Sequence, residues 1–298
     1  MSLTISAAQV DALIANPSSI SGYSASGPII ITGSITKAQA NSLNAVDATY
    51  IQATVSSDTV SNLSGIAVNN STRTSLNKFS FVVSDSSATA AELNAVQALT
   101  SVVVNASNIS GIEASSSTDI ATLYSGTVPS GIGSATISVN DTTINAATLN
   151  IIDGYSTGAI TTTASTITGA AADIKTALAS AITHPSDIAV TVTGTTVAAS
   201  DINTIETLTT GVTSVSDSVT RMTGTFAAVD EAFGHNDDLL PLVNNVRPPK
   251  RVNGLTNINV TLTGDPSIAN IVSTIAQTGT GKVTATAPST STALANYS

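Results

Sequence analysis

The sequence predicts a mainly β fold with short helices, arranged as an elongated repeat solenoid (β-solenoid-like) of about five degenerate units. One reason is that short β-branched runs recur along the chain, each followed by the same short phrase. The other is composition, because 42% of the residues are hydrophobic while only 9% are charged and 3% aromatic. Such a chain is ordered, with a core of small and aliphatic side chains, and stacked repeats bury their apolar faces on one another.

Each predicted unit begins with a β-branched run that ends in Gly or Asp, residues that reach turn conformations at low cost. A second β-rich run begins at Gly158, Gly211 and Gly281. A weaker marker, an aliphatic residue or Met, then Ser or Thr, then Gly, follows the second run, as in 167–169 and 222–224. The further copies of this marker are at 20–22, 63–65 and 109–111, and the β-branched runs are 29–33, 81–85, 137–141, 190–194 and 260–264.

The phrase after each β-branched run is an aliphatic residue, usually Asn, any residue, Ile or Val, and an acidic or amide residue. Its two apolar positions are three apart, which predicts a short helix with one buried face. In the third copy Asn145 or a nearby Thr is expected to be the N-cap. The whole unit therefore reads strand, turn, helix, strand, turn, helix. Copies begin at Leu43, Leu93, Leu149 and Ile202, which are 50, 56 and 53 residues apart, and a decayed fifth copy begins at Val272.

The repeated Asn44, Asn94, Asn150 and Asn203 are predicted to occupy equivalent positions in successive coils, each after a turn at Gly or Asp. Two roles remain open for them. They could stack as an internal amide ladder, or they could satisfy helix ends locally.

These phrases resemble a family of tandem repeats in bacterial surface and secreted proteins and in structural proteins of marine phages, including cyanophages. Its units read roughly Leu-Asn-x-Ile-Asp followed by Thr-Thr-Gly-x-Val-Thr. The match here spans Leu149 to Thr163 and Ile202 to Val215. The resemblance implies a structural or adhesive role without catalysis. The Gly-Gly-x-Gly-x-Asp calcium repeats of the secreted relatives are not found in this sequence, and its start and end look complete, which favours a virion component.

The predicted domains are a repeat solenoid at 1–230, an inserted loop at 231–255, and a final degenerate repeat with a C-terminal tail at 256–298. The interval between phrases rises to 70 residues across the loop, which holds three of the nine basic residues. We expect this loop to dock a partner chain through an apolar cluster and nearby cations. The alternative is a polar loop stiffened by two prolines. The expected docking residues are Phe233, Leu239, Leu240, Arg247, Lys250 and Arg251.

Catalytic, cofactor and metal sites are not expected. The chain has no cysteine and two histidines, His184 and His235, and it lacks a Gly-x-Ser-x-Gly nucleophile elbow. A net charge of −10 argues against nucleic-acid binding. The acidic residues of the insertion are better explained as a solvated loop than as an oxygen-ligand cation site. The residues of that rejected site are Asp230, Glu231, His235, Asp237 and Asp238.

The favoured function is a non-enzymatic structural protein of a phage virion, as an appendage, fibre or capsid-bound knob, with a possible part in host attachment. Its expected partners are other virion or surface subunits, further copies of itself and a host surface receptor. The first alternative is a secreted adhesin or surface-layer protein, located outside the cell or on its surface. The second is a β-helix polysaccharide depolymerase. Ice binding is a further alternative, because Thr-rich runs such as 161–163 could present a flat face. Residues 1–6 lack a secretory signal, and no stretch predicts membrane insertion.

Overall fold

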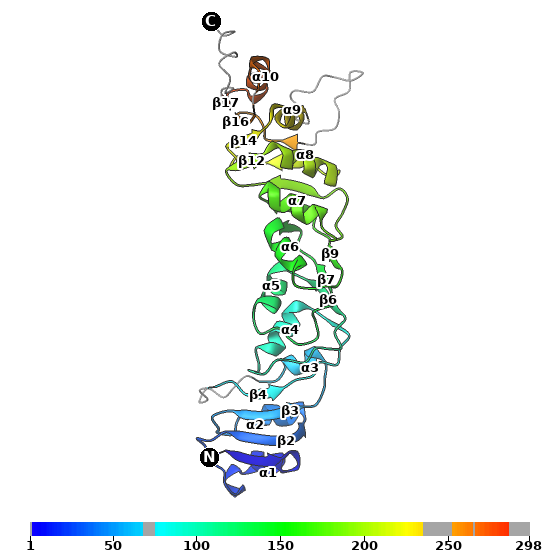
Figure 1. The fold of residues 1–298 in the computed structure, drawn as a ribbon. Coiled ribbons are helices and arrows are strands. Elements are labelled where there is room, and N and C mark those ends of the chain that lie inside the picture. Colours follow the sequence, from blue (N-terminus) through cyan, green and yellow to red (C-terminus); the bar gives the residue numbers. More distant parts are fainter. Residues whose placement is uncertain (1, 68–74, 235–251, 265, 286–298) are drawn as a thin grey trace. The chain divides into compact units, whose positions relative to one another are not determined.

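The computed structural model describes residues 2–67, 75–234, 252–264 and 266–285. The protein is an α/β protein in which parallel sheets alternate with helices, with 34% helix and 27% strand (Figure 1). The predicted mainly β solenoid is therefore wrong. The chain divides into two compact units, Met1–Asn140 with Gly154–Ile160, and Asp141–Asp153 with Thr161–Ser298. The boundary between the units thus does not coincide with the start of the predicted insertion.

Unit 1 carries two parallel sheets, with strand orders β1-β2-β3-β4 and β5-β6-β7-β9. Its consecutive helices α3, α4 and α5 pack on one another. Its strands are β1 (Leu3–Ser6), β2 (Ile29–Ile35), β3 (Ile51–Val55), β4 (Lys78–Ser80), β5 (Ser87–Ala88), β6 (Gly111–Ser115), β7 (Thr136–Val139) and the start of β9 (Ile160–Thr162). Its helices are η1 (Ala7–Gln9), α1 (Val10–Ala15), η2 (Pro17–Ser19), α2 (Lys37–Leu43), α3 (Val60–Ser64), α4 (Ala90–Gln97) and α5 (Ser117–Ser125).

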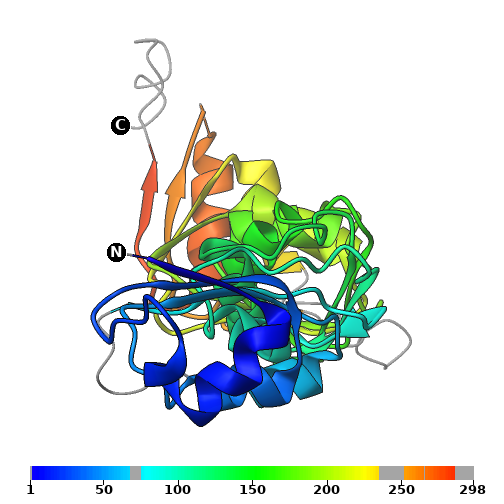
Figure 2. The same ribbon diagram turned by 90° about the horizontal axis from the view of Figure 1, so that it is seen from below.

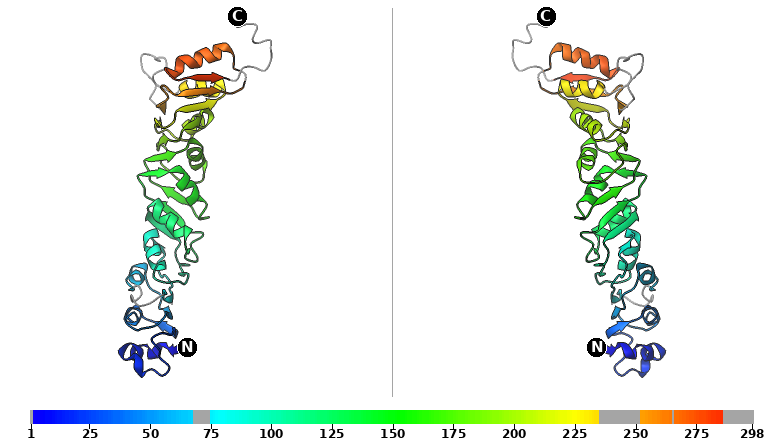
Figure 3. Two further views of the ribbon diagram at one scale, coloured as in Figure 1. Left: turned by 90° about the vertical axis from the view of Figure 1, so that its left-hand side faces the viewer. Right: turned by 90° about the vertical axis from the view of Figure 1, so that its right-hand side faces the viewer.

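Unit 2 also carries two parallel sheets, with strand orders β15-β13-β11-β10-β8 and β12-β14-β16-β17. Figure 2 shows β16 and β17 side by side, at the orange and red end of the colour bar, and Figure 3 shows α10 lying against them. Its strands are β8 (Thr143–Asn145), β10 (Thr166–Gly169), β11 (Ala189–Val192), β12 (Thr196–Ala198), β13 (Thr213–Val215), β14 (Arg221–Gly224), β15 (Val252–Asn253), β16 (Asn259–Leu262) and β17 (Val283–Ala285). Its helices are α6 (Ala146–Asp153), α7 (Ala171–Ala179), α8 (Ala199–Leu208), α9 (Phe226–Gly234) and α10 (Ile268–Thr278).

The structural repeat is about half as long as the predicted unit. Paired residues of neighbouring strands are typically 22 to 26 positions apart, as in Ile29 with Ile51 and Leu3 with Ile29. Each predicted unit of 50 to 56 residues therefore contains two structural repeats, each with its own helix. The pairing of Thr213 with Val252 spans 39 residues, because the chain between them includes 235–251.

Ser or Thr caps start α2, α3, α4, α5 and α10, whereas α7 and α8 follow Ala and have no side-chain cap. Thr89 accepts a hydrogen bond from the amide of Glu92, whose carboxylate accepts one from the Thr89 amide in return, a capping box. In the third phrase Asn145 accepts from the amides of Ala147 and Thr148, as predicted for an N-cap. In α4, α6 and α8 the first, fourth and seventh residues are all buried, namely Ala90, Leu93 and Val96, Ala146, Leu149 and Ile152, and Ala199, Ile202 and Ile205.

The residues at the start of the Thr-Thr-Gly part of the predicted unit bond to the preceding structural repeat in two places, at Thr209 and Ser156. Thr209 is buried, and its hydroxyl donates to the main-chain carbonyl of Ile188 at 2.7 Å while accepting from the amide of Gly211 at 2.9 Å. Ser156 makes the same contacts with Ala135 and Gly158 in unit 1. A Cβ on Gly211 would lie 2.3 Å from the carbonyl oxygen of Ile188. Glycine is therefore required there by the close approach of two backbones.

The weaker Ile-Ser-Gly marker does not have one structural meaning. Residues 167–169 and 222–224 lie in strands that lead into helices, whereas Leu63 and Ser64 end helix α3. Two of the predicted turn glycines are more consistent, since Gly194 and Gly264 have φ of 109° and 76° and each lies two residues after the end of a strand. Three-residue matches are too short to specify an element, because tertiary context selects between helix and strand.

Candidate interaction surface

Three of the repeated Asn residues each join a helix to the following one. Asn150, the fifth residue of α6, donates Nδ2 to the carbonyl of Asp173, the third residue of α7, at 3.0 Å. Asn203 in α8 does the same to the carbonyl of Ala228 in α9 at 2.9 Å. In unit 1 Asn94 of α4 donates to the carbonyl of the third residue of α5, Asp119, at 2.9 Å. The predicted equivalence is confirmed for these three residues, although they occupy alternate helices.

Other parts of the Asn prediction are wrong. Asn44 is the C-cap of α2 and donates to the carbonyl of Ala67, so the first phrase lies three residues later in its helix than the others. In α10 the fourth position is Ile271, and Val272 takes the fifth position, where the other phrases have Asn. The side chains of Asn94, Asn150 and Asn203 bond to main-chain carbonyls of the following helix instead of stacking as an amide ladder.

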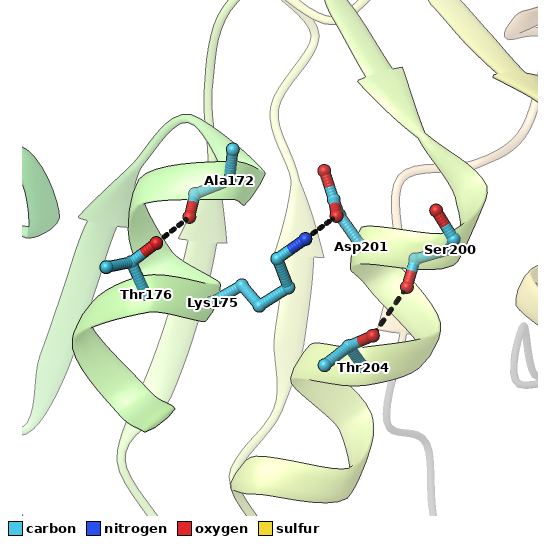
Figure 4. A network of polar contacts seen from close by, with 6 residues as sticks. All are labelled: Ala172, Lys175, Thr176, Ser200, Asp201 and Thr204. Atoms are coloured by element: carbon cyan, nitrogen blue, oxygen red, sulfur yellow. Dashed lines mark hydrogen bonds and ion pairs between the residues drawn. The ribbon is translucent and has the colours of Figure 1, made fainter. Parts of the chain in front are cut away.

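Between α7 and α8 the same connection is made by charge (Figure 4). Lys175, the fifth residue of α7, forms an ion pair with Asp201, the third residue of α8. Asp201 is the more buried partner, with a side chain 16% exposed against 38% for Lys175. Because Asp201 is largely shielded from water, this pair is screened less than an ordinary surface ion pair. The fifth residue of one helix thus contacts the third residue of the next helix either through an amide hydrogen bond or through an ion pair.

Helix α10 presents apolar side chains at the positions that earlier helices use for these contacts. Its fifth and eighth residues, Val272 and Ile275, are 58% and 50% exposed. The fifth position is half-buried in α6, α7 and α8, whereas in α9 it is the exposed Asp230. The eighth position is buried in the three preceding helices, as Leu178, Glu206 and Phe233. We call Val272 and Ile275 the α10 face. These two residues occupy positions at which earlier helices contact the next repeat, and the described residues contain no repeat after α10.

The predicted docking loop is only partly described. Phe233 belongs to α9 and is fully buried, so it is a core residue and the prediction that it docks a partner is wrong. At the other end of the predicted loop, Val252 pairs in β15 and Leu255 is fully buried. The reason is that a helix and a strand extend into the predicted loop from its two ends. Leu239, Leu240, Arg247, Lys250 and Arg251 lie outside the described residues.

The acidic side chains of the described chain are largely engaged with their own structure. Asp230 accepts from Nε2 of Gln277, and Glu231 accepts from Nδ2 of Asn203. Hydrogen bonds from Asn62 and from the Thr59 amide hold the pKa of Asp58 below its usual value. Among the described residues, no three His, Cys, Asp or Glu side chains gather as metal ligands. His235, Asp237 and Asp238 lie outside that part of the chain.

One histidine, His184, lies within the described residues. His184 lies before Pro185, and its Nδ1 is 2.9 Å from the Pro185 carbonyl oxygen. This local contact uses the ring nitrogen that a catalytic triad would direct at an acidic partner. The geometry therefore indicates no triad around His184.

Comparison with known proteins does not assign this chain to a family. No protein-family model, curated protein or solved structure matches it. Within the described ranges, no helix has both the length and the apolar character needed to cross a membrane.

Proposed function

We propose that this protein is a non-enzymatic structural subunit that associates with further copies of itself through the α10 face. The observation that carries the proposal is the exposure of Val272 and Ile275, at 58% and 50%, on helix positions used elsewhere for packing the next repeat. Exposed aliphatic side chains side by side on one helix favour association, because water is removed from them on contact. In such an assembly, the last described helix of one subunit packs on a helix of the next subunit, as successive helices pack within one chain.

The occupant that fits best is helix α1 of a second copy. One side of it carries exposed small residues, since Ala8, Ala12 and Ala15 lie at helical spacing along η1 and α1. Small side chains on one helix leave room for the larger Val272 and Ile275 of another. The contact would be heterologous, so repeated addition gives a fibre or a ring instead of a closed dimer.

This association suits a virion appendage or fibre, the assignment that we favour. A cell-surface layer or adhesin uses the same self-association and is the alternative. Immunogold labelling of particles and cells with an antibody to this chain separates them. Label on free or attached phage particles supports the virion assignment, and label on the envelope of uninfected cells refutes it.

The association itself is tested by analytical ultracentrifugation of the chain over a range of concentrations. Replacing both Val272 and Ile275 by Gln keeps good helix formers at both positions and removes the apolar face. We expect this variant to remain monomeric where the parent chain associates. The matched control is Ile151→Gln, because Ile151 is 55% exposed on another helix of the same unit. A parent chain that stays monomeric at all concentrations, or a double variant that associates as well as the control, refutes the proposal.

A further inference from the structure

The outer face of the sheet β12-β14-β16-β17 in unit 2 places two cations in one row. Arg221 of β14 pairs with Asn259 of β16, and Val260 pairs with Val283 of β17, so Asn259 neighbours Lys282. The main-chain amide of Lys282 donates to Oδ1 of Asn259 at 2.9 Å, which fixes this alignment. Neighbouring strands are about 4.8 Å apart, so the backbones of Arg221 and Lys282 are about 10 Å apart, with Asn259 between them.

A second row of side chains on the same face supplies hydroxyl groups. Thr223, Thr261 and Thr284 are paired across β14, β16 and β17. They lie two residues after Arg221, Asn259 and Lys282 along their strands, and alternate residues of a strand share a face. The buried Met222 and Val260 between the rows point into the core and keep both rows outward.

An open groove of about 400 Å³ lies over these rows. Its lining is Arg221, Asn259, Val260, Thr261, Lys282 and Thr284. This lining has two cations, an amide and hydroxyl groups but no carboxylate. An adjoining depression shares Asn259 with this groove and has Asp217 in its lining.

This grouping is unusual for so acidic a chain. The net charge is −10 and only nine residues are basic. Five of these are described, and Lys175 is held by Asp201 while Lys78 lies over the ring of Tyr50 at 4.3 Å. Arg221 and Lys282, in contrast, share one groove. Two like charges on one small surface repel each other, and an anion between them removes that repulsion.

We infer that this groove binds an acidic saccharide, carrying a carboxylate or sulfate group, and we call it the β14–β17 groove. The guanidinium of Arg221 offers the forked donors that suit a carboxylate or sulfate, and the ammonium of Lys282 offers a second charge. Asn259, Thr261 and Thr284 offer donors and acceptors to sugar hydroxyls next to the charged group. The inference does not depend on the self-association through α10.

The test is calorimetric titration of the full chain with short polyuronate and sulfated dextran oligosaccharides, with neutral dextran as the uncharged probe. We expect the charged probes to bind and neutral dextran not to bind, with affinity falling as salt is raised. Arg221→Gln and Lys282→Gln should each weaken binding about tenfold, the size expected for one charge-assisted hydrogen bond. Lys78→Gln is the matched control, since it removes one cation from unit 1 and should leave binding unchanged.

Circular dichroism melting of every variant checks that the fold is kept, as expected for exposed strand positions. Inorganic sulfate and phosphate, tested alone, separate saccharide recognition from simple anion capture. The inference is overturned if no acidic saccharide binds at millimolar concentration, or if Arg221→Gln and Lys282→Gln bind like Lys78→Gln. It is also overturned if inorganic sulfate binds as tightly as the sulfated oligosaccharide.

Discussion

Two nested replacements around 235–251 should have opposite effects on the stability of unit 2. In the short replacement, a four-residue Gly-Ser linker takes the place of 235–251. In the long replacement, the same linker takes the place of 231–255, the whole loop predicted from sequence. A linker of this length is reasonable, because four residues separate α8 from β13 and α10 from β17.

The magnitudes follow from burial at the two ends of the loop. The long replacement removes Phe233, Val252 and Leu255, all 0% exposed. Loss of a buried Phe costs about 3–5 kcal/mol, of a buried Leu about 2–5 kcal/mol, and of a buried Val about 1.5–3 kcal/mol. The combined cost, roughly 6–13 kcal/mol, is comparable to the whole stability of a domain. The short replacement keeps these residues and shortens the connection about fourfold, which favours the folded state by about 1 kcal/mol.

Denaturant titration followed by circular dichroism, with hydrogen exchange resolved to peptides of 256–285, distinguishes the two outcomes. We expect the short replacement to protect 256–285 as the parent chain does, and the long replacement to lose that protection. Equal protection in both variants would refute the view that Phe233, Val252 and Leu255 form part of the core. Loss of protection in the short replacement would show that 235–251 is needed for packing its own chain.

Three further predictions concern the repeat contacts and a tyrosine. Gly211→Ala should destabilise unit 2 by about 1–3 kcal/mol, because the new Cβ meets the carbonyl oxygen of Ile188, and thermal melting measures it. Asn150→Ala should cost about 1 kcal/mol through loss of its bond to α7, and an unchanged denaturation midpoint would contradict this role. Burial raises the pKa of Tyr124 to about 12, while an unfolded tyrosine ionises near pH 10. The stability from neutral Tyr124 should therefore be complete below pH 10 and decline towards pH 12, and Tyr124→Phe should abolish that part of the decline.

Local sequence patterns predicted much of the secondary structure. The runs at 29–33, 137–141, 190–194 and 260–264 overlap strands β2, β7, β11 and β16, and all five phrases overlap or adjoin helices. These signals are local, because capping and a three-residue apolar spacing act within one or two turns of chain. The same patterns misjudged the balance of helix and strand, since Ser and Thr suit both strands and helix caps.

The candidate surfaces could not be found by the same means. Arg221 and Lys282 are 61 positions apart in the sequence, and they share a groove only because β14, β16 and β17 are neighbours in one sheet. The exposure of Val272 has meaning only beside the fifth positions of the other helices, which requires the helix boundaries. Phe233 looks like any apolar residue next to a polar loop until the extent of α9 is known.

By itself, the sequence determined the tandem pattern, the approximate places of most strands and helices, and the equivalence of Asn94, Asn150 and Asn203, but not the register of Asn44. Only the tertiary structure decided that each predicted unit holds two βα repeats, and which side chains are buried. The physical reason is distance along the chain. Capping and turn formation involve neighbours in sequence, whereas strand pairing and burial join residues 22 to 26 positions apart, as in Leu3 with Ile29 and Ile29 with Ile51, and 39 across 235–251.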